Sequence, residues 1–243
     1  MGRATDKILG LESRWLMTRV MPRQFLDGVG DFLDEVAPDR KEETIDAIED
    51  RAAELVEADS RTVVDDPSKG ALAICAVVLA SYEALLPFLD GDKARTILRL
   101  QQVMGTVLKG PYEFAFGTLS KREDPLDKID SACRKEEPFY GEGWDIEYDR
   151  PRQDLFEMKV HRCFYKEFFE RHENRLLTTV MCAFDVNFMR PIDPAVSGLR
   201  AERSSLMSLG DEQCRFAVME TDDPNARYTD ALEERFGEAA KSA

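Results

Sequence analysis

The chain has 243 residues, of which 43% are hydrophobic and 33% are charged, and its formal net charge is −15. This composition is typical of a globular protein with a substantial core. The negative charge disfavours binding to phosphate backbones or anionic lipids unless a basic patch exists, and the Lys and Arg residues are scattered among acids. We therefore expect neither a nucleic-acid partner nor a membrane partner.

The cellular location is inferred from two segments. Met1–Val20 mixes charged and apolar residues and lacks the apolar core of a secretion signal. The longest apolar run, Ala71–Ala80, is too short to cross a bilayer, and Glu83 and Pro87 follow it. We expect a cytoplasmic protein, in which the five cysteines are reduced thiols.

The first half of the chain has helical periodicity. An amphipathic segment, Arg23–Val36, ends before Pro38. Asp39 and Glu42 have the spacing of a capping box, so Asp39 is expected to cap the next helix.

Two further helices are expected before residue 119. Asp66-Pro67 is a start signal for a helix over Ser68–Leu89 that is apolar nearly all round and should be the buried centre of a bundle. Asp90–Asp92 contains the break that follows it. Another helix is expected over Lys93–Leu108, ending at Gly110-Pro111.

The second half changes to the alternating pattern of strands. Residues 119–140 are charged and read as a connection with at most one short helix. The expected elements are strands at Asp145–Asp149 and Leu155–Cys163, helices at Phe164–Arg171 and Leu176–Phe184, and a strand pair at Leu199–Leu209 and Cys214–Thr221. Leu209–Glu212 has the composition of a hairpin turn that would join this last pair.

These patterns predict an α+β protein, with an N-terminal helical bundle followed by a small antiparallel sheet with packed helices. We expect a helical part at residues 1–118, a charged connection at 119–140, and an α+β part at 141–243 that carries the chemistry.

Thiols, imidazoles and acids gather in this last part. Cys163, Cys182 and Cys214 are there, as are both histidines, His161 and His172. Such side chains act as nucleophiles, bases and metal ligands. Each of the three thiols has a titratable neighbour within three residues, and on a strand His161 and Cys163 share a face.

Other candidates have simpler structural explanations. Cys75 lies within the apolar helix and is expected in the core, Cys133 has no identifiable partner, and His172 is expected at a solvated helix end. Trp15 and Trp144 could line a pocket, although packing is the default explanation for both.

A metal site is an alternative to a thiol site. Cys163, Cys182 and Cys214 with Asp185 or His161 would make a soft ligand set. Their spacings match no zinc motif, and the chain has no glycine-rich phosphate loop, GxSxG or HExxH motif. We expect no metal and no cofactor.

One ordered series of residues is more specific than its parts. It consists of Cys163, Cys182-x-x-Asp185, Arg203 followed by Ser204 and Ser205, and Gly210-Asp211-x-x-Cys214-x-Phe216. This series, within roughly Asp154–Glu220, resembles the L-2-amino-thiazoline-4-carboxylic acid hydrolase family. The stretch Glu170–Arg175 departs from the glycine-containing turn usual there, which bears on the shape of the pocket.

The resemblance implies a hydrolase that opens a cyclic amidine, the ring of an amino-thiazoline carboxylate becoming N-carbamoyl-cysteine. On this basis we expect an enzyme that cleaves a C–N bond of a small thiazoline-type or related molecule containing nitrogen and sulfur.

Roles can be assigned within that reaction. Cys182 or Cys214 could be the nucleophile as thiolate, and Asp185 could act as base or hold the amidinium. Arg203 could pair with the substrate carboxylate, supported by Asp211, with Cys163 and His161 also near the substrate. An equally simple mechanism has Asp185 activate water while the thiols only line the pocket.

Other functional classes stay open. The same fold could be a non-catalytic small-molecule or metal-binding module, or a helical interaction protein whose cysteines are core residues. The apolar segments of the first half could also bury against a second copy, so a homo-oligomer is possible.

Overall fold

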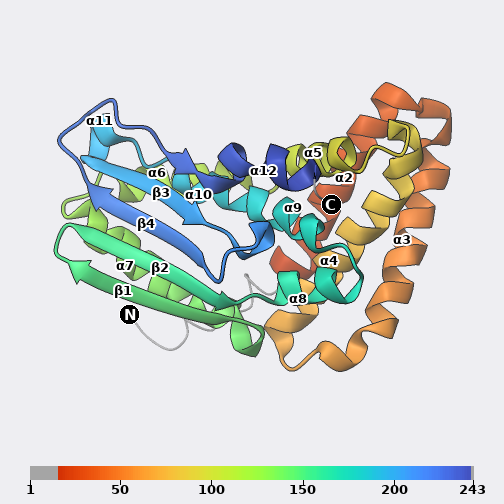
Figure 1. Ribbon diagram of the computed structural model, residues 1–243, viewed down its shortest axis with the longest axis horizontal. Coiled ribbons are helices and arrows are strands. Elements are labelled where there is room, and N and C mark those ends of the chain that lie inside the picture. Colours follow the sequence, from red (N-terminus) through yellow and green to blue (C-terminus); the bar gives the residue numbers. More distant parts are fainter. Residues whose placement is uncertain (1–15, 242–243) are drawn as a thin grey trace.

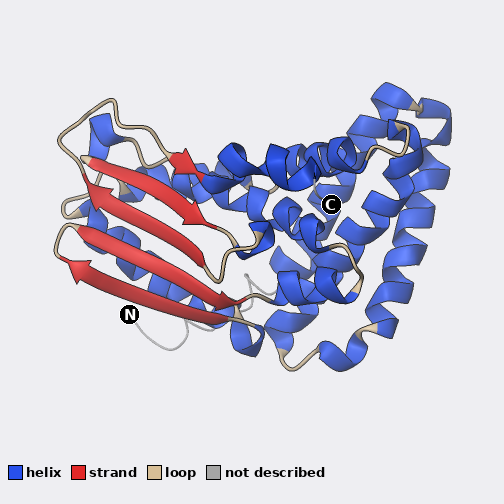
Figure 2. Ribbon diagram, viewed as in Figure 1, coloured by secondary structure: helices blue, strands red, loops and turns tan. Residues whose placement is uncertain are grey.

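The structure, a computed structural model, describes residues 16–241 (Figure 1). Trp15 and most of the N-terminal segment expected to lack a secretion signal lie outside the described residues. Figure 2 shows a sheet on one side of the molecule and helices on the other and behind it. The α+β class, with helices first and the sheet after them, is confirmed.

The helices of the first part include one central helix. They are α2 (Met21–Val36), α3 (Lys41–Ala58), α4 (Asp66–Leu85), α5 (Lys93–Met104) and α6 (Lys109–Leu119). The central α4 packs against α2, α3 and α5, and also against α8 of the second part. Most of its residues are buried, as its uniformly apolar sequence predicts.

The start of α4 is fixed by a capping box one residue earlier than expected. The Asp65 carboxylate accepts a hydrogen bond from the Ser68 backbone N–H at 2.8 Å, and the Ser68 hydroxyl accepts one from the Asp65 N–H at 3.0 Å. Pro67 lies in the first turn, where its missing N–H leaves no bond unmade.

The capping role predicted for Asp39 is wrong. Pro38–Arg40 form a 3₁₀ turn that leads directly into α3, so Asp39 lies inside a turn and not before it. The N-cap of α3 is Arg40, and no side chain caps it.

The predicted stop at Gly110-Pro111 is also wrong. The chain turns earlier, after Met104, and Leu108 has a left-handed φ of 53°. Helix α6 then starts at Lys109, so Pro111 lies in a first turn, where proline is tolerated.

The charged connection contains the short helix α7 (Pro125–Glu136), which packs against β2 and β4. It is therefore part of the layer that covers the sheet. Helices of the two parts pack together at α4 with α8 and at α5 with α9. The domain boundaries at 118 and 140 stay a prediction.

The sheet has the order β1-β2-β4-β3-β5. Its strands are β1 (Asp145–Arg152), β2 (Leu155–Arg162), β3 (Leu199–Ser205), β4 (Cys214–Glu220) and β5 (Thr229–Asp230). The first four pair antiparallel, as predicted. The two-residue β5, which the sequence did not indicate, pairs parallel to β3 and places Asp230 opposite Arg203.

The helices of the second part are short except for two. They are α8 (Phe164–Arg171), α9 (Thr178–Cys182), α10 (Val186–Met189), α11 (Pro194–Ser197) and α12 (Ala231–Lys241). Helix α8 has the predicted bounds. The helix predicted over Leu176–Phe184 is instead α9 between two 3₁₀ turns, the second at Ala183–Asp185.

One described helix, Asp66–Leu89, is long and apolar enough to cross a membrane by composition, with a mean hydropathy of 2.1. Of the 18-residue apolar window within this helix, 67% is buried inside the protein. The helix therefore serves as the core helix of this fold. The cellular compartment stays a prediction.

Gly141, ahead of β1, offers a test of this packing. Its φ is +65°, and an added Cβ would overlap the Asp65 carboxylate, which accepts the Glu142 N–H at 2.6 Å. We expect Gly141→Ala to lower the free energy of unfolding by about 2–4 kcal/mol, measured by urea denaturation.

The matched control is Gly91→Ala. Gly91 also has a positive φ, of +74°, but nothing lies within 4 Å of its Cβ position. The free energy of unfolding of the Gly91→Ala variant should fall by only about 1 kcal/mol, as a result of backbone strain. Equal losses in the two variants would contradict the close approach of Asp65.

Candidate active site

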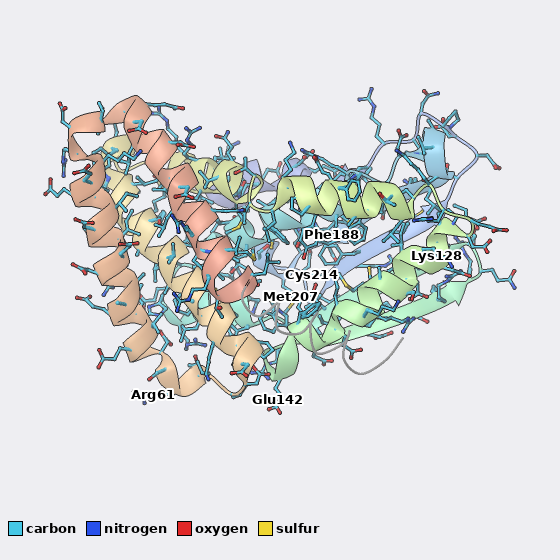
Figure 3. The ribbon with its side chains drawn as sticks, turned by 180° about the vertical axis from the view of Figure 1, so that it is seen from behind. Arg61, Lys128, Glu142, Phe188, Met207 and Cys214 are labelled. Carbon is cyan, nitrogen blue, oxygen red and sulfur yellow. The ribbon has the colours of Figure 1, made fainter. Side chains whose placement is uncertain are left out.

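A cavity of about 170 Å³ lies between the helices of the first part and elements of the second. It is lined by Leu16, Met21, Tyr112, Glu136, Phe139, Tyr140, Trp144, Tyr165, Met181, Phe184, Asp185 and Phe188. A single water needs only about 10–15 Å³ of such space, so a small organic molecule fits. Phe188 marks its place in the middle of the molecule in Figure 3.

Aromatic rings form most of the wall and hold one another in place. The Trp144 ring contacts Tyr140 and Tyr165 edge to face, with centroids 5.8 Å and 5.2 Å away. Tyr112 meets Phe184 edge to face at 5.2 Å. Such pairs stabilise the wall beyond the area that they bury. Trp144 therefore both packs and lines a pocket.

Two carboxylates, Asp185 and Glu136, lie in this wall of aromatic and aliphatic side chains. Burial raises the pKa of Asp185 to about 6, although the nearby Arg203 charge opposes the shift. Burial also raises the pKa of Glu136 to about 7. Both acids can therefore change protonation state near neutral pH, which is a property of catalytic and binding sites.

Asp185 is held by the fully buried side chain of Arg203. Arg203 Nη1 donates to Asp185 Oδ2 at 2.9 Å and to the Cys182 carbonyl at 2.6 Å. Its Nε and Nη2 donate to the two oxygens of Asp230 at 2.8 Å and 2.7 Å. The guanidinium is bidentate on Asp230, the geometry of a strong charge-assisted pair.

This geometry speaks against the role predicted for Arg203. A side chain with no exposed surface, bonded to two carboxylates and a carbonyl, is not available for a substrate carboxylate. Arg203 instead fixes the position of Asp185.

The three predicted thiols are not among the residues that line the cavity. Cys182 Sγ is 3.5 Å from the Ser208 hydroxyl, and Cys214 Sγ accepts the Met207 N–H at 3.3 Å. Figure 3 shows Met207 and Cys214 adjacent at the centre of the molecule. Burial raises the pKa of Cys163 and of Cys214 to about 12 and that of Cys182 further. All three are neutral thiols at pH 7.

The remaining predicted substrate residues lie elsewhere. His161 is on the exposed face of the sheet, where its Nε2 is 3.1 Å from Glu147 Oε2. Asp211 joins the β3–β4 turn to α12 through Arg235 and accepts the Leu206 N–H. His172, expected in solvent, is partly buried and bonded to Asp59 at 2.7 Å.

The metal hypothesis finds no support among residues 16–241. No group of three or more His, Cys, Asp or Glu side chains in that range is arranged to hold a metal ion.

Sequence reasoning missed the other half of the site. Glu136, Phe139 and Tyr140 come from the segment predicted to be a connection, and Tyr112 comes from α6. The available signal was an acid followed by aromatic residues over 136–144, including Trp144.

Arg203 can be tested by its removal. We expect Arg203→Met to lower the free energy of unfolding by about 3–5 kcal/mol, because the buried Asp230 carboxylate loses its counter-charge and keeps the hydrogen bond from the Leu232 N–H. Adding Asp230→Leu should recover part of this loss. Arg200→Met, on the same strand but partly exposed, should cost less than about 1 kcal/mol in urea denaturation. Equal losses for Arg200 and Arg203 would contradict the role given to the buried pair.

Comparison with known proteins adds the family. The family described as L-2-amino-thiazoline-4-carboxylic acid hydrolase matches residues 77–218. No curated protein matches the chain. The matched region includes Tyr112, Glu136, Trp144, Asp185 and Arg203. Because it covers more than half of the 243 residues, the chain belongs to the L-2-amino-thiazoline-4-carboxylic acid hydrolase family.

Proposed function

We propose that the protein is a hydrolase that opens a small ring containing nitrogen and sulfur, with water activated by Asp185 in the aromatic cavity. The observation that carries this proposal is the position of Asp185. It lines the cavity, Arg203 holds its Oδ2, and its Oδ1 accepts no hydrogen bond from the described residues. A carboxylate with a pKa of about 6 is a suitable general base near neutral pH.

The atom balance identifies the bond that breaks. In N-carbamoyl-cysteine the former amidine carbon keeps both nitrogens, has gained the oxygen of water and has lost sulfur. The expected cleavage of a C–N bond does not fit this product, so the proposed reaction cleaves the C–S bond of the ring.

Asp185 can serve both proton transfers of this reaction. It accepts a proton from water as the oxygen bonds to the amidine carbon. The C–S electron pair then leaves on sulfur, and the carboxylic acid returns the proton to the thiolate. The proton left on the former water oxygen is released to solvent as the urea carbonyl forms, so an amidinium substrate gives a neutral thiol-urea and one proton. General acid–base catalysis by one side chain commonly contributes about 10²–10⁴ in rate.

The thiol mechanism is less well supported. A nucleophilic cysteine reacts as thiolate, and reactive cysteines lie in electropositive, partly exposed surroundings. Burial instead raises the pKa of Cys182 and Cys214, and neither residue lines the cavity. Cys214 lies in the hydrophobic core, and Cys163 and Cys182 pack against it.

Activity measurements separate the two mechanisms. We expect Asp185→Asn to lower kcat at least about 100-fold, while Cys182→Ser and Cys214→Ser stay within about tenfold of the parent protein. The assay follows thiol formation from thiazoline amidines by mass spectrometry. Asp154→Asn, which removes a carboxylate paired with Arg152 at the β1–β2 turn, is the matched control.

Loss of activity in Cys182→Ser with activity retained in Asp185→Asn would replace the proposal by a thiolate mechanism. Tight binding of these amidines with no turnover in the parent protein would instead favour the non-catalytic binding module.

The pKa of Asp185 predicts a pH dependence. The base must be ionised, so kcat/KM should fall as pH falls through about 6, because protonated Asp185 cannot accept a proton from water. The measurement is initial rate at low substrate between about pH 8 and pH 5. A profile that is flat to about pH 5 would be incompatible with Asp185 as the base.

A further inference from the structure

The cavity wall has the chemistry of a cation-binding site. Tyr112, Tyr140, Trp144 and Tyr165 line it together with Phe184. The face of an aromatic ring attracts a cation, and the attraction grows to about 2 kcal/mol when water is excluded. Aromatic walls alone would also accept a neutral ring, so the charges around the cavity decide between the two.

The charges leave the wall negative. Arg203 is the one cation in a network with two carboxylates, Asp185 and Asp230. Glu136 makes no ion pair within the described part of the chain, and burial disfavours its charged form. One positive charge in the cavity would offset this imbalance and favour ionised Glu136.

The wall offers little to an anion. No Lys, Arg or His is among the described residues that line the cavity. A carboxylate on the ligand would therefore meet Asp185 and Glu136 without a counter-charge from these residues. Like charges brought together in such a site cost affinity.

From these observations we propose that the cavity selects a small planar cation, an amidinium without an adjoining carboxylate. The inference deepens the proposed function, since it concerns the same cavity and names the substrate class. A decarboxylated 2-amino-thiazoline fits this class, whereas the carboxylate-bearing compound in the family name does not.

Three ligands test the proposal by isothermal titration calorimetry of the full chain near neutral pH. They are 2-amino-2-thiazoline, which is a cation there, the neutral thiazolidin-2-one, and L-2-amino-thiazoline-4-carboxylate. We expect the cation to bind about tenfold more tightly than either of the others, or better. Equal affinity for the neutral ring, or tighter binding of the carboxylate, would overturn the proposal.

Variants assign the selectivity to the wall. Glu136→Gln should weaken the cation about tenfold and leave thiazolidin-2-one unchanged, whereas Glu137→Gln, at an exposed neighbouring carboxylate, should change neither. Trp144→Leu should weaken the cation, and Trp144→Phe should restore most of the affinity. Unchanged cation affinity in both Glu136→Gln and Trp144→Leu would contradict the assignment. Thermal unfolding checks that each variant is folded.

Failure of this inference can be told apart from failure of the proposed function. Selective binding of 2-amino-2-thiazoline without thiol formation would leave this inference standing and remove the hydrolase. Turnover of L-2-amino-thiazoline-4-carboxylate in preference to 2-amino-2-thiazoline would overturn this inference and leave the proposed hydrolase standing.

Discussion

The buried guanidinium of Arg203 is the constraint on which the second part of the fold depends. A charge with no exposed surface is tolerated only when it is paired and hydrogen-bonded, and three residues from two segments of the chain do this for Arg203. Strand β5 exists over only two residues, and one of them is Asp230, opposite Arg203 on β3. The Cys182 carbonyl that accepts from Arg203 belongs to the last residue of α9, where the 3₁₀ turn begins. The sheet and the broken helix are thereby joined at one point.

The same interaction connects stability with the chemistry of the site. Burial alone would push Asp185 toward its neutral form, and the charge of Arg203 opposes this. The result is a carboxylate with a pKa of about 6, which is ionised at neutral pH and still basic enough to accept a proton. Because Arg203 is also bidentate on Asp230, Asp185 is held by a group that cannot itself move toward the cavity.

Much of the fold can be predicted from the periodicity of short sequence segments. The site depends on which side chains become buried, and no short segment reveals that. Helix α8 and the four antiparallel strands were predictable because their periodicity is regular over seven or eight residues. Strand β5 was not predictable, because two residues are too few to show an alternating pattern. Asp185 and Arg203 could be singled out by the resemblance, but the role of Arg203 depends on its complete burial. Glu136 looked like one acid among many in a charged segment.

Cysteines attract attention in a sequence because they are rare, but burial can take away the reactivity that makes them candidates. Here it raises the pKa of Cys163 and Cys214 to about 12, while it brings two carboxylates into the physiological range. In the proposed reaction a cationic ring plus water yields a neutral thiol-urea and one proton. The substrate therefore offsets the negative wall and the product does not. The charge imbalance that favours entry of the substrate then also favours release of the product, which gives the uncompensated Glu136 a function beyond binding.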